Sequence, residues 1–268
     1  MQSKNTGDFK EFKIDPWSFT SIPIEMYSDE TKLAHGTAFF YKKKNKTYLI
    51  TNFHNLSGIN PNNGKLLDPL GRTPTKITFS VCKNNTESLL CSIEEKECKL
   101  YEKDNRLWVS NKNKEIDIAL LEVDIPKECF VSPINEMVQC EDMHVGIGMD
   151  VFALGFPQKM YTQQIPIWKR ASIASEYSMS IDNMPKLLID AATYKGMSGA
   201  PVIMRSNGSY RTNDGNAAMI FGSPSFPTKF LGIYSGRYLL EDDDNKLHQA
   251  QLGIVWKKEL IEEMLLCS

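Results

Sequence analysis

The sequence of 268 residues predicts an all-β protein that ends in an α-helix. Short runs rich in β-branched and aromatic residues recur along the chain, separated by Gly, Pro and Asn turn signals. This is typical of β-barrels or sandwiches, and the alternation of strands and helices that marks a parallel sheet does not occur. Near the C-terminus, Leu260, Ile261, Met264 and Leu265 recur at three- to four-residue spacing. This pattern predicts an amphipathic helix over residues 257–268.

The first part of the chain, residues 1–30, is expected to form an N-terminal arm that packs on the body of the protein or on another subunit. The body, residues 31–256, divides into two groups of strands joined by a crossing segment over 129–147. The first group, over about 32–128, is expected to contain strands at 36–41, 47–52, 75–82, 88–94, 106–109 and 117–123. The second group, over about 148–256, is expected to contain strands at 150–155, 165–175, 187–191, 200–204, 230–236 and 250–255.

The composition is that of an ordinary globular protein, with 41% hydrophobic and 24% charged residues. A formal net charge of −2 gives no electrostatic reason to expect binding to nucleic acid or to an anionic membrane. The N-terminus contains no apolar signal-peptide core, and no stretch approaches the ~20 apolar residues needed to span a bilayer. We therefore expect a cytoplasmic protein.

The six cysteines are scattered along the chain, without a CxxC pair or a His/Cys cluster. This spacing argues against a zinc site, and in a reducing compartment the cysteines would be free thiols. A disulfide between Cys82 and Cys91 across a hairpin stays open as an alternative. No metal or organic cofactor is expected.

The segment 190–201 contains a serine, Ser198, between two glycines. Gly196 lets the backbone turn so that the N–H groups of Gly196 and Ser198 can point at one oxygen, which is the geometry of an oxyanion hole. Taken alone, the same residues also fit an ordinary Gly-Ser turn.

Two further segments supply the groups that a nucleophilic serine requires, a base and a residue that orients the base. His54 ends an apolar, β-rich run at the point where a strand gives way to a loop, and Asp117 precedes a strongly apolar strand. Each residue alone is more simply explained by packing or by a turn, but the chain order His, Asp, Ser is a known order of the Ser-His-Asp triad. The remaining histidines are predicted to be surface or packing residues: His35, His144 and His248.

Together these segments resemble the trypsin-like serine proteases of the chymotrypsin fold, and among them the HtrA (Do-like) branch. The resemblance covers roughly residues 34–240. It is carried by residues 36–40, 49–54, 117–121, 151–157, 190–192, 196–201 and 231–233. It implies two six-stranded antiparallel β-barrels followed by the C-terminal helix. We expect no PDZ-like segment after the protease domain.

The resemblance also implies a serine endopeptidase that hydrolyses a protein or peptide substrate through an acyl-enzyme. His54 would be the general base, Asp117 the residue that orients it, and Ser198 the nucleophile. The N–H groups of Gly196 and Ser198 would be the oxyanion donors.

Substrate binding is expected on the strand that pairs with the substrate backbone in this family, at Tyr234, Ser235 and Gly236. Ala192 lies six residues before Ser198, where digestive enzymes place the acid that binds Arg or Lys. Ala192 and the adjacent Thr193 are neutral, so we expect a small or medium apolar residue before the scissile bond.

The chain departs from the family pattern around these residues. Asn55 follows His54, where the family usually has Val, and Ala200 stands where a second Gly is commoner. Met197 replaces the acid that pairs with a newly cut N-terminus in secreted digestive and clotting proteases, so no proteolytic maturation is expected. Control would then come from loops, a regulatory partner or homo-oligomer formation.

Two alternatives to an active protease stay open. One is a catalytically silent or latent protease-fold module that acts in binding or sensing. The other is a different hydrolase, such as an esterase on an α/β-hydrolase fold, although that fold needs the order Ser, Asp, His and a βαβ pattern. Residues 205–229 are longer than the compact HtrA-type connection, and either border the substrate channel or form a tolerated surface loop.

Overall fold

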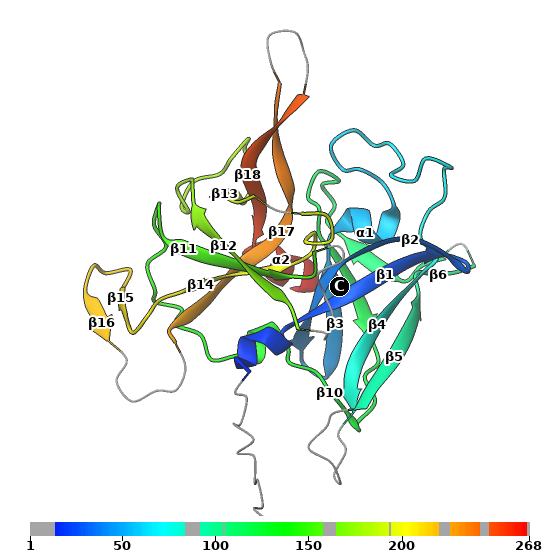
Figure 1. Ribbon diagram of the computed structural model, residues 1–268, viewed down its shortest axis with the longest axis horizontal. Helices are drawn as coiled ribbons and strands as arrows, with labels where there is room; N and C mark the ends of the chain where they lie inside the picture. The colour runs from blue at the N-terminus through cyan, green and yellow to red at the C-terminus, as the bar shows by residue number, and fades with distance from the viewer. Residues whose placement is uncertain are drawn as a thin grey trace, which may run out of the picture.

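Two β-rich halves lie side by side in the computed structural model (Figure 1). The structure describes residues 14–83, 92–103, 105–157, 165–192, 194–219, 226–241 and 247–266. Every strand pair in these segments is antiparallel, so the α/β-hydrolase alternative, which requires a parallel sheet, is excluded.

The second half is a closed six-stranded barrel with the strand order β11-β12-β13-β18-β17-β14. Its strands are β11 (Asp150–Gly155), β12 (Ile167–Ile173), β13 (Lys186–Asp190), β14 (Pro201–Arg205), β17 (Thr228–Glu241) and β18 (Leu247–Lys257). Small and branched side chains fill its interior, among them Val151, Ala153, Val202 and Val255. The six strands predicted for this half are confirmed.

The first half is an eight-stranded sheet with the order β10-β4-β1-β2-β3-β9-β8, and β5 also pairs with β4. Its strands are β1 (Ser21–Ser28), β2 (Thr31–Lys43), β3 (Lys46–Thr51), β4 (Lys76–Lys83), β5 (Ser92–Lys99), β8 (Trp108–Ser110), β9 (Ala119–Val123) and β10 (Cys129–Phe130). Two short strands, β6 (Tyr101–Glu102) and β7 (Asn105–Arg106), form a separate hairpin.

This sheet curls into a half-barrel beside the closed barrel, and the expected all-β, chymotrypsin-like fold with a C-terminal helix is confirmed. Within the described residues, the first half differs in detail from the expected six-stranded barrel, because its eight-stranded sheet stays open. The strand β5 explains why the sheet stays open. Its sequence carries Glu94, Glu95, Lys96 and Glu97, and its described side chains are exposed or half-buried. A charged edge strand remains in contact with water and does not accept a further strand.

The expected N-terminal arm is shorter than predicted, because residues 21–28 form β1 between β2 and β4. Ile24 and Met26 alternate with polar neighbours and are buried. Before this strand, the 3-10 helix η1 (Pro16–Phe19) places Trp17 in the core. Arg205 of the second half forms an ion pair with Asp15 at 2.5 Å, which fixes the described end of the arm to that half.

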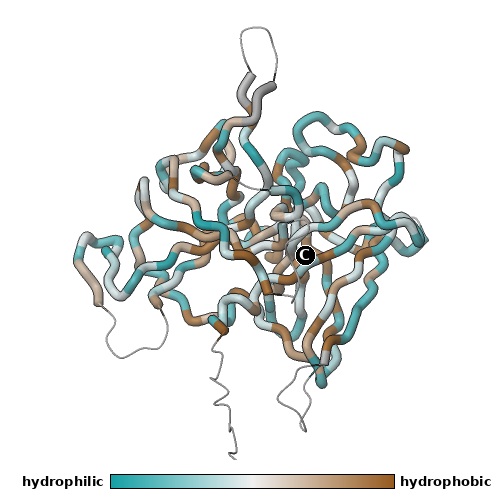
Figure 2. The backbone as a smooth tube through the Cα atoms, in the orientation of Figure 1, coloured by the Kyte–Doolittle hydropathy of each residue, from teal (hydrophilic) through white to brown (hydrophobic). Residues whose placement is uncertain are grey.

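The two halves and the C-terminal helix share one apolar cluster. Phe39 of β2 meets Phe230 of β17 in an edge-to-face contact with ring centroids 5.5 Å apart. The helix α2 (Glu259–Leu266) buries its apolar side in this cluster through Leu260, Ile261, Met264 and Leu265. Hydrophobic residues accordingly concentrate toward the inside of both halves (Figure 2). Because both halves pack on this shared core, the loops that face each other across their junction are held in fixed relative positions.

The helices of the described residues are all too short or too polar to cross a bilayer. Cys98, Cys129 and Cys140 are free thiols. The alternative of a disulfide between Cys82 and Cys91 involves a residue outside the described part of the chain, as does Cys267.

Candidate active site

His54 is delivered to the junction of the halves by β3. The strand ends at Thr51, and the chain then forms the one-turn helix α1 (Phe53–Ser57). Gly58 ends α1 in a left-handed conformation with φ 70°, and its N–H donates to the His54 carbonyl at 3.0 Å. His54 therefore lies in a helical turn, not in the predicted loop, and its side chain is 18% exposed.

Asp117 orients His54 through both of its carboxylate oxygens. The His54 ring Nδ1 lies 2.7 Å from Asp117 Oδ2, and the His54 backbone N–H donates to Asp117 Oδ1 at 2.9 Å. Asp117 is itself held because the Asn52 side-chain amide donates to its carbonyl at 2.7 Å. A carboxylate only accepts hydrogen bonds, so the Nδ1 proton lies between the two residues and Nε2 is left as an acceptor.

Ser235 is a third donor to this carboxylate, with its Oγ 2.5 Å from Asp117 Oδ2. The sequence predicted Ser235 only as a substrate-binding residue. Its role toward Asp117 depends on a contact between residues 118 positions apart, and no local pattern indicates such a contact. The Asp117 carboxylate is almost fully buried, and these three donors offset the loss of water around it.

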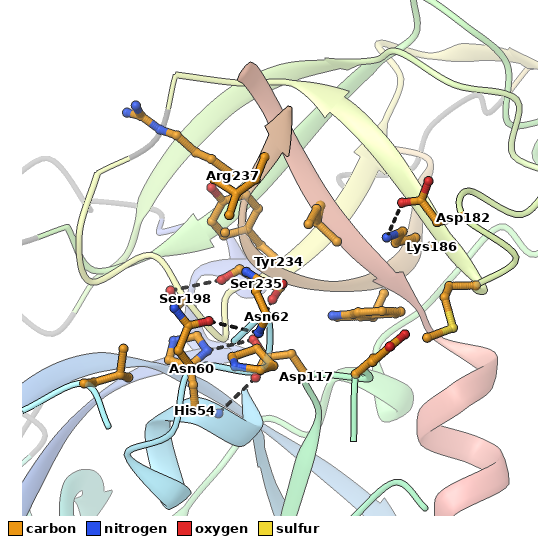
Figure 3. Close-up of a pocket in the computed structure, with 18 of the residues that line it drawn as sticks. His54, Asn60, Asn62, Asp117, Asp182, Lys186, Ser198, Tyr234, Ser235 and Arg237 are labelled. Atoms are coloured by element: carbon orange, nitrogen blue, oxygen red, sulfur yellow. Dashed lines mark hydrogen bonds and ion pairs between the residues drawn. The ribbon is translucent and has the colours of Figure 1, made fainter. Parts of the chain in front are cut away.

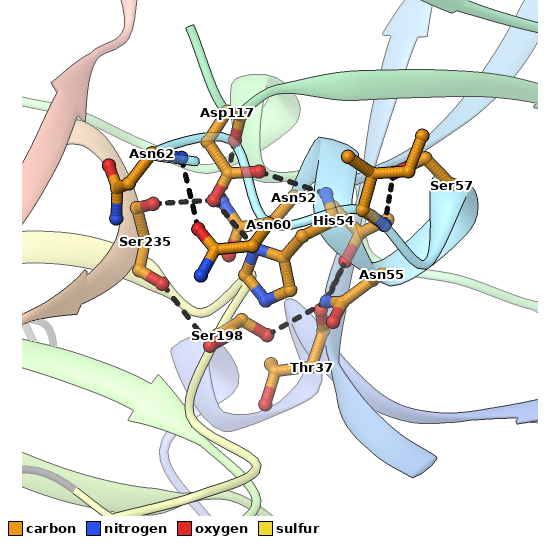
Figure 4. A network of polar contacts seen from close by, with 12 residues as sticks. Thr37, Asn52, His54, Asn55, Ser57, Asn60, Asn62, Asp117, Ser198 and Ser235 are labelled. Atoms are coloured by element: carbon orange, nitrogen blue, oxygen red, sulfur yellow. Dashed lines mark hydrogen bonds and ion pairs between the residues drawn. The ribbon is translucent and has the colours of Figure 1, made fainter. Parts of the chain in front are cut away.

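Ser198 lies next to the His54 ring, with Asp117 on the other side of that ring (Figure 4). The Ser198 hydroxyl donates to the Ser235 carbonyl at 3.2 Å, and no hydrogen bond joins it to His54 in the described part of the chain. The structure thus brings all three predicted triad residues together, with the hydroxyl turned toward Ser235.

The backbone at Gly196 requires glycine. Its φ is +97°, and a Cβ there would lie 2.3 Å from His35 Nε2 and 2.4 Å from the Phe156 carbonyl oxygen. The N–H groups of Gly196 and Ser198 donate to no atom of the described residues. Both are therefore available to an oxygen outside the protein, as an oxyanion hole requires.

A cavity of about 850 Å³ opens beside these residues and contains His54, Asp117 and Ser198 in its wall. The candidate triad lies at one end of the cavity, and the ion pair of Asp182 with Lys186, at 2.8 Å, lies at the other (Figure 3). Apolar side chains contribute much of the remaining wall: Leu67, Met184, Leu239, Ile254 and Trp256. Its wall therefore offers both polar and apolar contacts to a ligand.

The predicted substrate-binding residues divide into three groups. Tyr234, Ser235 and Gly236 line the cavity. Ala192 is exposed and is not among the lining residues, so the predicted neutral floor at this position is not part of the cavity. Thr193 lies outside the described residues.

Other candidates occupy different places. His144 is exposed, and nothing is described for the side chain of His248. His35 lies against Gly196, and burial lowers its pKa from the usual value.

The insertion contributes the hairpin β15 (Ser209–Arg211) and β16 (Ala217–Met219), which borders a separate cavity of about 620 Å³ and lies away from the triad (Figure 1). Its described residues do not line the active-site cavity, which favours the interpretation as a surface loop.

A family model described as a trypsin-like peptidase domain matches residues 36–209, well over half of the chain. No curated protein sequence matches significantly.

Three similar solved structures are proteases by their descriptions. An HtrA-type protease, AlgW with a tripeptide, is 14% identical, with a TM-score of 0.49, over 93% of this chain and 60% of that chain. The serine endoprotease from Yersinia pestis is 14% identical, with a TM-score of 0.45, over 93% of this chain and 62% of that chain. The MamO protease domain from Magnetospirillum magneticum is 14% identical, with a TM-score of 0.45, over 92% of this chain and 95% of that chain. The chain thus spans about 60% of the length of the first two.

Proposed function

Because the chain belongs to the trypsin-like peptidase domain family, we propose that it is a serine endopeptidase that hydrolyses peptide bonds through an acyl-enzyme. One observation carries the proposal. The buried carboxylate of Asp117 accepts hydrogen bonds from the His54 ring and backbone, and the opposite edge of that ring faces Ser198 in the wall of the cavity. A merely structural histidine would not need a buried carboxyl group at one ring nitrogen and a nucleophile's hydroxyl beside the opposite edge of the ring.

The proposed reaction begins when Ser198 Oγ attacks the carbonyl carbon of the substrate and its proton passes to His54 Nε2. The imidazolium that forms is stabilised by Asp117 across the 2.7 Å contact. The negative charge on the substrate oxygen is met by the N–H groups of Gly196 and Ser198. His54 then gives its proton to the leaving amine, and the C–N bond breaks. A water molecule repeats these steps on the acyl-enzyme and releases the acid.

Substrate binding would itself release the nucleophile. The β17–β18 register shifts at Ser235, because Tyr234 and Gly236 pair with consecutive residues of β18 and Ser235 has no partner there. Its carbonyl therefore takes no part in the regular hydrogen-bond pattern of the barrel. That carbonyl accepts the Ser198 hydroxyl. A substrate backbone N–H that pairs with this strand would compete for the same oxygen, and the freed hydroxyl could turn to His54.

The experiment that tests the proposal is hydrolysis of a denatured protein by the purified chain. We expect new N-termini to accumulate with the wild type and not with Ser198→Ala or His54→Ala. Cleavage that persists in Ser198→Ala would refute the assignment. Absence of cleavage by a folded wild type would instead support the alternative of a silent or latent module.

A further inference from the structure

Three polar residues are buried on the first half where it faces the loop 196–199. They are Thr37 of β2, Thr51 of β3 and Asn55 of α1, and all are 4% exposed or less. Burial of polar groups is unfavourable unless each is hydrogen-bonded. The partners of these three side chains therefore indicate what the cluster holds in place.

The Thr37 hydroxyl holds the carbonyl of Gly196. Thr37 Oγ1 donates to the Gly196 carbonyl oxygen at 2.7 Å and accepts from the Phe156 N–H at 3.1 Å. The Phe156 amide can only donate, so the hydroxyl proton is committed to Gly196. The peptide that follows Gly196 is also held at its nitrogen, because the Met197 N–H donates to the Tyr194 carbonyl at 3.3 Å.

The Ser198 carbonyl is held by two donors from the same cluster. The Thr37 N–H donates to it at 2.9 Å, and Asn55 Nδ2 donates to it at 3.3 Å (Figure 4). Asn55 Nδ2 also donates to Thr51 Oγ1 at 2.9 Å, and Thr51 Oγ1 donates to the Thr37 carbonyl at 2.7 Å. The Asn55 amide is thereby held by the Thr51 hydroxyl, which is itself held by the Thr37 carbonyl.

These contacts limit how the peptide that carries the Ser198 N–H can turn. The Ser198 carbonyl is fixed on one side of its peptide, and on the other side the Gly199 N–H donates to the Tyr234 carbonyl at 2.9 Å. The Ser198 N–H belongs to the peptide between two such fixed groups. A carbonyl that turned into the oxyanion position would repel the developing charge, whereas both carbonyls here are drawn toward the first half.

We propose that Thr37 and Asn55 are positioning residues for the oxyanion hole, which they form indirectly by holding the Gly196 and Ser198 carbonyls away from it. The inference rests on the proposed function. The side chains act on the reaction only through the loop, and neither touches the substrate.

The test compares Asn55→Val, Thr37→Val and Thr37→Ser with the wild type. The readouts are kcat, KM and the inhibition constant of a peptide aldehyde, whose tetrahedral adduct places an oxyanion in the hole. We expect Asn55→Val and Thr37→Val each to lower kcat at least tenfold and to raise the inhibition constant of the aldehyde at least tenfold. KM should stay within about twofold of the wild type. The expectation follows because loss of one oxyanion donor costs about 100- to 1000-fold in rate. Thr37→Ser keeps the hydroxyl and should recover most of both.

Thr20→Val is the matched control, because Thr20 is equally buried and its hydroxyl donates to a backbone carbonyl at 2.7 Å outside the site. It should leave kcat and the inhibition constant of the aldehyde unchanged. Should Thr37→Val fail to fold, Asn55→Val decides, and unfolding of Asn55→Val would show a structural role and overturn the inference. An active wild type with losses below tenfold in the folded variants would also overturn it, while an inert wild type would refute the proposed function and this inference with it.

Discussion

Replacing Asp117 with asparagine should leave the protein folded and remove nearly all turnover. Three donors meet this carboxylate: the His54 ring and Ser235 at Oδ2, and the His54 backbone at Oδ1. Asparagine satisfies all three only when its oxygen takes the Oδ1 place and its NH₂ takes the Oδ2 place. The NH₂ then donates to His54 Nδ1 and to a rotated Ser235 hydroxyl. The proton of the neutral ring moves to Nε2, which can no longer accept the proton of Ser198.

The expected magnitudes separate catalysis from stability. A wrong histidine tautomer lowers kcat by about 10³- to 10⁴-fold, which corresponds to about 4–5.5 kcal/mol in activation free energy. The free energy of unfolding should fall by roughly 1–3 kcal/mol, because three charge-assisted hydrogen bonds become neutral ones while a buried charge is removed. The two effects should therefore differ clearly in size.

The assay is steady-state hydrolysis of a peptide, with urea unfolding of the same preparations. Asp124→Asn is the matched control, since Asp124 is exposed and directly follows β9, the strand that Asp117 precedes, and it should change neither quantity. A folded Asp117→Asn protein that keeps more than a tenth of the wild-type kcat would show that Asp117 does not determine the tautomer of His54.

Three other variants test the geometry around the triad. Ser235→Ala removes the 2.5 Å donor to Asp117 but leaves the His54 contacts, so kcat should fall far less than in Asp117→Asn, by about 3- to 30-fold. An equal fall would mean that Asp117 orients the ring only while Ser235 holds it. Gly199→Ala places a Cβ 1.9 Å from the Thr37 carbonyl oxygen at φ +91° and should lower the free energy of unfolding by more than about 3 kcal/mol. The control Gly64→Ala, at φ +68° with open space around it, should lower it by only about 1 kcal/mol. Equal losses in urea unfolding would contradict the close approach at Gly199. Burial lowers the pKa of His35 in the folded protein, so its contribution to stability is present above the ordinary pKa of about 6.5 and is lost as the pH falls below that value. In urea unfolding between pH 7 and pH 5, His35→Gln should therefore lose less stability than the wild type. Parallel plots of unfolding free energy against pH for the two proteins would reject this explanation.

Local sequence patterns predicted those features that depend on neighbouring residues. Short β-rich runs between turn signals located the six strands of the closed barrel, and the three- to four-residue spacing located α2. The strand β1 was missed because it contains Pro23, which has no backbone N–H to donate and so weakens a strand pattern. The open edge of the first half was missed because closure depends on pairing between distant strands, which local alternation does not reveal.

In the candidate site too, the sequence indicated some residues, whereas contacts between distant residues could not be predicted. Chain order indicated His54, Asp117 and Ser198, whereas the contacts of Thr37 and Asn55 with the nucleophile loop join residues 159 and 143 positions apart. No spacing rule connects such residues. The expectation for Ala192 came from counting back from Ser198, and counting does not determine which residues face the cavity; the structure places Ala192 at the surface instead.

The central claim, that Ser198 is the activated nucleophile, is tested most directly by mass spectrometry after treatment with a fluorophosphonate. A serine without a base does not react at a useful rate, so the label reports the whole arrangement of Ser198, His54 and Asp117. We predict one adduct per chain, on the peptide that contains Ser198, and no adduct in Ser198→Ala or His54→Ala. An adduct on another serine, or one that persists in Ser198→Ala, would contradict the account.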